Sequence, residues 1–322
     1  MELYPLKFQP LFKYRMWGGE KLKTVLNKEY QEKSIGESWE ISDVKNDATL
    51  VDNGLLEGKS IQELIADFGS AFLGQKVVDQ FGTKFPLLIK FIDAKTPLSI
   101  QVHPSDELAR ERHQSFGKNE MWYVMQADDE AELIAGFQKK ISKQEYISVL
   151  EEGKILDVLH SQQVAAGDVF NIPTGRVHAI GAGVLLAEIQ QTSDITYRIY
   201  DYNRVDAKTG NTRELHTKEA VDAIDYTVET KYTTDYTLKT NTSEKLVHTP
   251  YFKTNILELS GSIDEDHSNK DSFVIYMCVA GNAELKFKDT SYSLKTGETL
   301  LLPACIKAFE LTGTAKLLEV SL

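Results

Sequence analysis

Hydrophobic residues along the chain recur at every second position or in short unbroken runs, a pattern typical of β-strands. The clearest strands are expected at Phe85–Ile92, Thr96–Val102, Glu120–Met125 and Ala131–Phe137. The stretches 164–198 and 231–322 consist of further short strands, separated by turns rich in glycine and proline. We therefore expect a mainly β protein.

Helical signals are few and local. Ser60 and Glu63 have the spacing of a capping box, as do Ser142 and Glu145, and each pair precedes apolar residues at helical spacing. Further short helices are expected after Gly69, up to Gln80, and over residues 217–224, while residues 1–56 show no long helical period. The helices should be short insertions in a β fold.

An internal repeat divides the chain. Gly167–Pro173 resembles Gly297–Pro303, each with a glycine, an acidic residue, strand residues and a proline, and a second apolar strand follows each copy. A repeat this long predicts two similar β-barrels rather than a solenoid. We place a catalytic, metal-binding unit at residues 1–225 and a second unit at 226–322. The second unit should lack metal ligands, because Ala308 stands where the first has His178.

Composition narrows the functional class. The chain has 322 residues, a net charge of −12 and only two cysteines. It needs no disulfide framework, has no apolar run long enough to span a membrane, and lacks the basic stripe of a nucleic-acid-binding protein. We expect a cytoplasmic enzyme or small-molecule binder with no membrane or nucleic-acid partner. In so acidic a protein, a phosphate site must be a local cluster of cations.

Four polar residues could converge on one metal ion. Gln101 and His103 are two positions apart, so in a strand they face the same side. Glu120 opens another predicted strand, and His178 follows the turn at Pro173–Gly175. Two imidazoles, a carboxylate and an amide oxygen suit zinc or a neighbouring divalent ion with a position left open for substrate.

Four stretches give the chain a specific resemblance. They are LSIQVHP at Leu98–Pro104, GKNEMWYV at Gly117–Val124, GDVFNIPTGRVHAIGAG at Gly167–Gly183 and EIQQTSDITYR at Glu188–Arg198. In order and spacing they resemble the type I mannose-6-phosphate isomerases (phosphomannose isomerases) of the cupin superfamily, in their short bacterial form. The resemblance implies two cupin-like jelly-roll barrels, the second degenerate.

The resemblance also implies chemistry and roles. The family interconverts mannose 6-phosphate and fructose 6-phosphate, a phosphosugar reaction of carbohydrate metabolism. It implies one Zn²⁺ per chain, bound by Gln101, His103, Glu120 and His178. Further pocket positions implied by the resemblance are Lys90, Ser99, Lys118, Glu188 and Arg198.

The expected reaction passes through a cis-enediolate stabilised by the zinc. Glu188 is the first candidate for the base that moves the proton and Lys118 the second, unless the two merely form an ion pair. Arg198 would stabilise the enediolate or shuttle hydroxyl protons. The cation that holds the phosphate remains open among Lys90, Lys95, Lys118, Arg198 and Arg204.

Two other functions compete with this one. His103, Glu120 and His178 alone form a two-histidine, one-carboxylate set that could hold Fe(II) in another metal-dependent cupin enzyme acting on a phosphosugar. A non-catalytic cupin that binds a sugar phosphate is the second alternative. Gln101 and the nearby cations favour zinc and an anionic substrate. The oligomeric state is left open.

Overall fold

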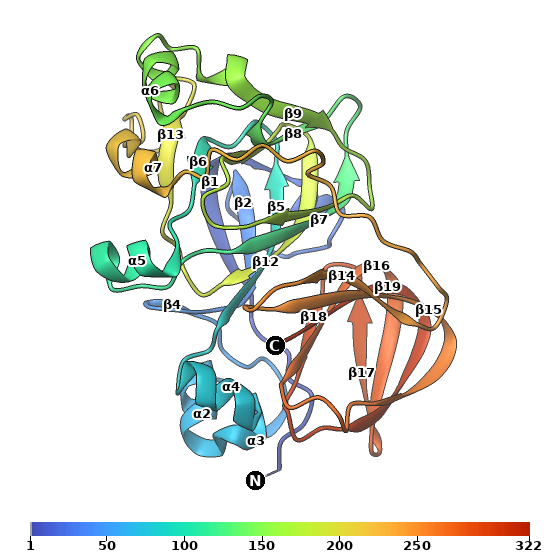
Figure 1. The fold of residues 1–322 in the computed structure, drawn as a ribbon. Helices are drawn as coiled ribbons and strands as arrows, with labels where there is room; N and C mark the ends of the chain where they lie inside the picture. The colour runs from blue at the N-terminus through green and yellow to red at the C-terminus, as the bar shows by residue number, and fades with distance from the viewer. Residues whose placement is uncertain (1) are drawn as a thin grey trace.

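The computed structural model describes residues 2–322, and strands dominate it (Figure 1). The first sheet has the order β1 (Leu11–Gly19), β2 (Ile35–Ile41), β5 (Leu87–Ala94), β12 (Val184–Gln191), β7 (Glu120–Ala127), β10 (Val169–Ile172). The second has the order β13 (Tyr197–Tyr200), β6 (Ile100–Val102), β11 (His178–Ile180), β8 (Glu132–Phe137), β9 (Leu159–Gln163). Together these sheets form the N-terminal unit of the molecule.

The C-terminal unit is a separate sheet. Its order is β14 (Ser243–His248), β15 (Lys253–Asp266), β19 (Ala308–Ser321), β16 (Val274–Phe287), β17 (Thr290–Lys295), and β18 (Thr299–Leu302) also pairs with β16. The predicted repeat is visible in the pairing, because the order β15-β19-β16-β18 matches β5-β12-β7-β10 in the first sheet. The mainly β fold with two related units is therefore confirmed.

Short helices lie outside the sheets (Figure 1). They are α1 (Lys21–Thr24), α2 (Ile61–Phe68), α3 (Ser70–Leu73), α4 (Gln75–Phe81), α5 (Asp106–His113), α6 (Lys143–Glu151) and α7 (Thr217–Ala223). There are also 3₁₀ turns at Gly54–Leu56 and Ile155–Val158. The strands β3 (Asp43–Val44) and β4 (Asp47–Ala48) form a small hairpin. Both expected capping boxes are present, at Ser60 and at Ser142. None of the described helices is long and apolar enough to cross a membrane.

The sequence-based assignment missed some elements. Residues 96–99 do not continue the strand that begins at Ile100, and residues 231–242 contain only isolated bridges. Helix α5 and the first two strands were not predicted. Helix α5 has a single buried residue, Ala109, so it offers no apolar stripe to detect, although Ser105 caps its first turn.

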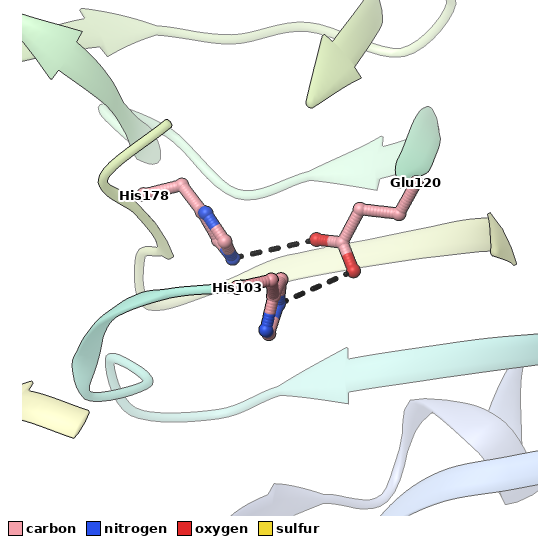
Figure 2. Close-up of side chains that lie close together, drawn as sticks. All are labelled: His103, Glu120 and His178. Atoms are coloured by element: carbon pink, nitrogen blue, oxygen red, sulfur yellow. Dashed lines mark ion pairs between the residues drawn. The ribbon is translucent and has the colours of Figure 1, made fainter. Parts of the chain in front are cut away.

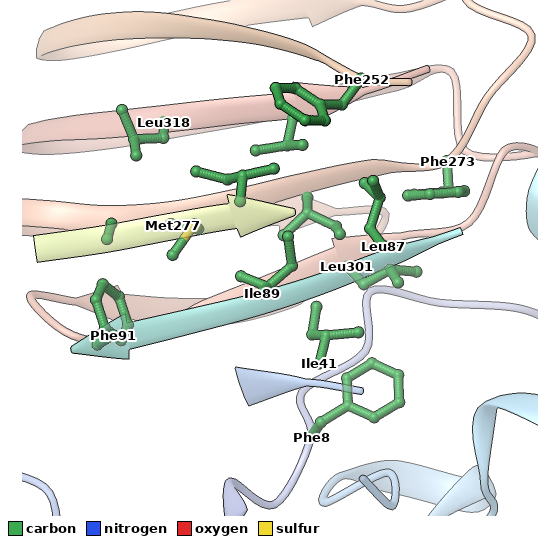
Figure 3. Close-up of a cluster of buried hydrophobic side chains, with 14 of the residues drawn as sticks. Phe8, Ile41, Leu87, Ile89, Phe91, Phe252, Phe273, Met277, Leu301 and Leu318 are labelled. Atoms are coloured by element: carbon green, nitrogen blue, oxygen red, sulfur yellow. The ribbon is translucent and has the colours of Figure 1, made fainter. Parts of the chain in front are cut away.

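The two units share one hydrophobic core (Figure 3). Leu87, Ile89 and Phe91 of β5 pack in the same cluster as Met277 of β16 and Leu318 of β19. Successive strand residues point to opposite faces, so the alternate β5 residues, including Lys90, face the interior of the N-terminal unit. One face of the first sheet thus rests on the C-terminal unit, and the other presents polar groups to the interior of the N-terminal unit.

Candidate active site

Two rows of side chains, one on each N-terminal sheet, build the site. In the first sheet Trp39, Lys90, Glu188 and Trp122 are direct cross-strand neighbours on β2, β5, β12 and β7. Directly opposed residues project to the same face of a sheet. In the second sheet, Arg198, Gln101 and His178 form an equivalent row on β13, β6 and β11.

Three possible metal ligands converge from different strands (Figure 2). Glu120 begins β7, His178 begins β11, and His103 directly follows β6. Nε2 of His103 lies 3.5 Å from Oε2 of Glu120, and Nε2 of His178 lies 3.4 Å from Oε1 of the same carboxylate. All three residues are buried. The structure therefore brings together three of the four expected ligands through atoms that can bind a cation.

Main-chain carbonyls orient both imidazoles. Nδ1 of His103 lies 2.9 Å from the carbonyl oxygen of Ile195, and Nδ1 of His178 lies 2.8 Å from that of Arg176. A carbonyl can only accept, so each Nδ1 carries the proton and each Nε2 presents a lone pair to the cluster. Such outer contacts are a regular feature of histidines that bind metals.

The fourth expected ligand, Gln101, also reaches the cluster. Its amide nitrogen lies 3.3 Å from Nε2 of His178, as suits a ring nitrogen that carries a lone pair. A cation at this place would instead attract the amide oxygen, which a half-turn of the amide group supplies. Gln101 and Lys118, which contact the three buried ligands, also line the cavity.

Burial and neighbouring charges set the protonation states of the cluster. Burial, helped by Lys118, lowers the pKa of His103 to about 4, and burial also lowers the pKa of His178. Burial alone would raise the pKa of Glu120, but Lys118 and His103 outweigh it and hold that pKa well below its usual range. Near neutral pH the cluster therefore has two neutral imidazoles and one carboxylate, the forms in which these groups bind a metal.

The residues present fit a divalent metal ion. Besides the donor set and its protonation, Oε1 of Glu120 is buried without a hydrogen-bond partner among residues 2–322. A buried carboxylate oxygen without a donor is costly unless a cation balances it. The ammonium of Lys118 supplies part of that balance, 2.7 Å from Oε2 of Glu120 and 3.1 Å from Nε2 of His103.

The candidate base, Glu188, faces the cavity beside this cluster. Its Oε2 accepts a hydrogen bond of 2.9 Å from the indole of Trp122, and its Oε1 lies 3.1 Å from Nζ of Lys90. Lys90 also lies 5.1 Å from the centre of the Trp39 ring. Glu188 is therefore paired with Lys90, while Lys118 is paired with Glu120, and the two candidate bases do not pair with each other.

The cavity has a volume of about 390 Å³. Its lining includes the expected residues Lys90, Ser99, Gln101, Lys118, Glu188 and Arg198, together with Arg15, Trp17, Glu37, Trp39 and Arg213. Sequence reasoning missed the residues of β1 and β2 because these strands were not predicted. It missed Arg213 because this residue belongs to no motif. The i, i+2 spacing of Arg15 with Trp17 and of Glu37 with Trp39 was the available signal.

Two expected substrate contacts lie elsewhere. Lys95 is exposed in the turn after β5 and does not line the cavity. Arg204 is engaged away from the cavity, where its guanidinium donates to the carbonyl of Pro97 and to Asp201. The structure therefore brings neither cation to the site.

A second group of possible metal ligands lies in the C-terminal unit, where none was expected. Ligand atoms of Glu265, His267 and Glu319 lie within 4.8 Å of one another. Internal partners already engage them, because Lys270 lies 2.7 Å from Glu319 and 3.1 Å from His267, and the Tyr276 hydroxyl donates to Glu319. The two acids therefore already have a lysine and a histidine as partners for their charges.

Comparisons with known proteins agree on one family. Residues 5–140 match the model of the type I phosphomannose isomerase catalytic domain, and residues 242–322 match that of the mannose-6-phosphate isomerase cupin domain. A mannose-6-phosphate isomerase of Streptococcus mutans is 33% identical over 98% of this chain and 97% of its own length. One from Bacillus subtilis is 34% identical over 98% of each chain. The crystal structure of a mannose 6-phosphate isomerase from Bacillus subtilis superposes with a TM-score of 0.90 at 32% identity, covering 99% of both chains.

Proposed function

The chain belongs to the type I phosphomannose isomerase family and is an isomerase of that class, and we propose that it interconverts mannose 6-phosphate and fructose 6-phosphate with one Zn²⁺ held by Gln101, His103, Glu120 and His178. The observation that carries the proposal is the convergence of oriented imidazoles and an ionised carboxylate next to a cavity whose lining includes several cations. When bound, the ion would polarise the substrate carbonyl and stabilise negative charge on the neighbouring oxygens.

Aldose–ketose isomerisation moves a proton between C2 and C1 of the sugar through a cis-enediolate. It requires a base that can reach both carbons from one face. Glu188 supplies a carboxylate at the cavity wall, and its Oε1 has no contact besides Lys90 among the described residues. We assign Glu188 as this base, with Trp122 and Lys90 fixing the carboxylate in place.

Lys118 has a different role in this proposal. Burial alone would lower the pKa of Lys118, but Glu120 and Glu188 raise it, so the side chain remains an ammonium. An ammonium cannot accept a proton. We propose that Lys118 instead donates a hydrogen bond to a substrate oxygen as negative charge develops there, which lowers the energy of the enediolate.

Solvent exchange tests the assignment of Glu188 directly. Glu188→Gln keeps the shape of the side chain and removes its basicity, so kcat should fall at least about 100-fold with KM changed less than about threefold. The rate at which deuterium from D₂O enters C1 and C2 should fall in parallel, as mass spectrometry of the sugar would show. Glu152→Gln, an exposed acid outside the cavity, is the matched control. A Glu188→Gln variant that exchanges deuterium at the wild-type rate would remove Glu188 as the base.

A further inference from the structure

The charge distribution in the cavity points to a specific anion site. Arg198 is half-buried, and among residues 2–322 no carboxylate lies within ion-pair distance of it. Its Nε donates to the hydroxyl of Ser99 and its Nη1 to the carbonyl of Glu214, which leaves Nη2 without a partner in the described chain. A half-buried cation without a counter-charge is costly, so this position favours an anion.

Two more guanidiniums lie at the same end of the cavity. Arg213 and Arg15 line it with Arg198, and burial together with the nearby charge of Arg213 lowers the pKa of Arg198. Arg213 donates to Asp201 through Nε and Nη2, and Arg15 donates to Glu37 through Nη2. We call Arg15, Arg198 and Arg213 the arginine cluster.

The ion pairs of the arginine cluster leave the guanidinium of Arg198 without a paired carboxylate in the described part of the chain. Asp201 is shared by two guanidiniums, because Arg204 also pairs with it from outside the cavity. Glu37 pairs with Arg15 and Asp201 with Arg213, whereas no carboxylate among residues 2–322 forms an ion pair with Arg198. A phosphate monoester near neutral pH carries a charge between about −1.5 and −2. The phosphate of a sugar phosphate could therefore supply the counter-charge that Arg198 lacks.

Two further acids, Asp194 and Asp206, line the cavity, and neither forms an ion pair with Arg198. Asp206 accepts hydrogen bonds from the hydroxyl of Tyr14 and the main-chain amide of Lys208, whose ammonium lies 4.8 Å from the centre of the Tyr14 ring. Asp194 is exposed to solvent. The other cavity cations, Lys90 and Lys118, are each paired with a buried glutamate closer to the metal ligands.

We propose that the arginine cluster, together with the Ser99 hydroxyl, binds the phosphate group of the substrate and so fixes which sugars are turned over. This inference rests on the proposed function and deepens it. It replaces the expected role of Arg198 at the reacting carbons with a role at the phosphate, and it replaces Lys95 and Arg204 by Arg15 and Arg213. Planar guanidiniums suit this task because they donate two parallel hydrogen bonds to phosphate oxygens.

Inorganic phosphate is the probe, and the test uses the full-length, metal-loaded protein. Arg198→Gln, Arg213→Gln and Arg15→Gln should each raise the Kd for phosphate, measured calorimetrically, at least about tenfold, equivalent to about 1.4 kcal/mol. KM for mannose 6-phosphate should rise in parallel, while kcat changes less than about threefold because the cluster does not touch the reacting carbons. Arg213→Lys, which keeps the charge, should recover part of the affinity.

Two control variants make the test specific. Arg204→Gln removes the other partner of Asp201 from outside the cavity and should leave phosphate affinity within about twofold of wild type. Arg112→Gln, which breaks a surface pair with Asp222, should do the same. If Arg204→Gln weakens phosphate binding as much as Arg213→Gln, or if the cluster variants bind phosphate like wild type, the assignment is overturned.

The outcomes separate this inference from the proposed function. A wild-type protein that binds phosphate through the cluster and yet fails to isomerise mannose 6-phosphate would overturn the function and leave the anion site standing. A protein that isomerises mannose 6-phosphate and whose cluster variants lose only kcat, with phosphate affinity unchanged, would overturn the anion site alone. Melting temperatures of the variants identify any loss that comes from misfolding.

Discussion

Glu120 illustrates how a few neighbours determine what one side chain can do. The same carboxylate faces His103 through one oxygen and His178 through the other, and Lys118 lies 2.7 Å away. These contacts keep a fully buried acid ionised. Without such neighbours it would take up a proton and lose its value as a ligand.

Metal content provides a test of Glu120. Glu120→Gln removes the only anionic donor from the cluster, so metal retained after dialysis should fall at least tenfold, as elemental analysis would measure. Glu319→Gln is the matched control, because Glu319 is also a buried carboxylate and already pairs with Lys270. Retention of a full equivalent of metal by Glu120→Gln, or its loss from Glu319→Gln, would show that the ion binds elsewhere.

The motif residues were predictable from the sequence because each stands in a short, characteristic stretch. Gln101 and His103 are two positions apart, and the resemblance placed Glu120 and His178 beside them. Arg15 and Arg213 could not be found in this way. Each reaches the cavity through tertiary contacts, Arg15 from an unpredicted strand and Arg213 from the segment that follows β13.

Strand β5 shows how one element serves both stability and chemistry. Leu87, Ile89 and Phe91 pack against the C-terminal unit. Lys90, which stands between the last two in the sequence, points the other way and lines the cavity. A shift of one residue in register would exchange these two faces. The position of Lys90 and Glu188 therefore depends on the burial of their apolar neighbours.

Loss of that burial should have a large and measurable effect. Phe91→Ala removes a fully buried ring from the shared core and should lower the free energy of unfolding by about 3–5 kcal/mol. Leu55→Ala, at a side chain that is 81% exposed, should change it by less than about 0.5 kcal/mol. Denaturant titration of both variants measures the difference. Equal effects would mean that the shared core is not what stabilises β5.

Strands that alternate between apolar and polar residues were predictable, whereas the partly exposed β1 was not. The residues Leu11–Met16 are all half-buried, so no clear alternation distinguishes them from a loop. Gly18 and Gly19 interrupt the pattern further, and the structure shows why glycine is needed at both positions. A side chain at Gly18 would collide with the main chain at Gly36, and one at Gly19 with the carboxylate of Asp93. Close packing of this kind leaves no periodic signal in the sequence.

The N-terminal unit of the molecule holds the candidate active site. The C-terminal unit contributes to the shared hydrophobic core and has a buried polar network of its own. The related strand orders of the two units agree with the repeat seen in the sequence. Glu319 of β19 pairs with Tyr276 of β16, as Glu188 of β12 pairs with Trp122 of β7. In both cases the carboxylate accepts a hydrogen bond from that aromatic partner.

Stability at acid pH should depend on Glu319. Burial would raise the pKa of Glu319, but His267 and Lys270 outweigh it and lower the pKa to about 2. A group with a lowered pKa stabilises the fold above its unfolded pKa and loses that effect as the pH falls. The wild-type protein should therefore lose roughly 3 kcal/mol more than Glu319→Gln between about pH 5 and pH 2.

Denaturant titrations at a series of pH values measure this difference. The exposed variant Glu284→Gln should follow the wild-type curve, because its side chain is in solvent in both states. Identical pH dependence of wild type and Glu319→Gln would mean that Glu319 is not ionised in the folded protein.

The most direct experiment on the whole account is a zinc titration of chelated protein during mannose 6-phosphate turnover, with fructose 6-phosphate detected by a coupled assay. Activity should vanish on chelation and return linearly until one Zn²⁺ per chain is bound, and Glu120→Gln should recover none of it. Undiminished activity in metal-free protein, or a break in the titration at two ions per chain, would show that the cluster of Gln101, His103, Glu120 and His178 is not the single catalytic metal centre.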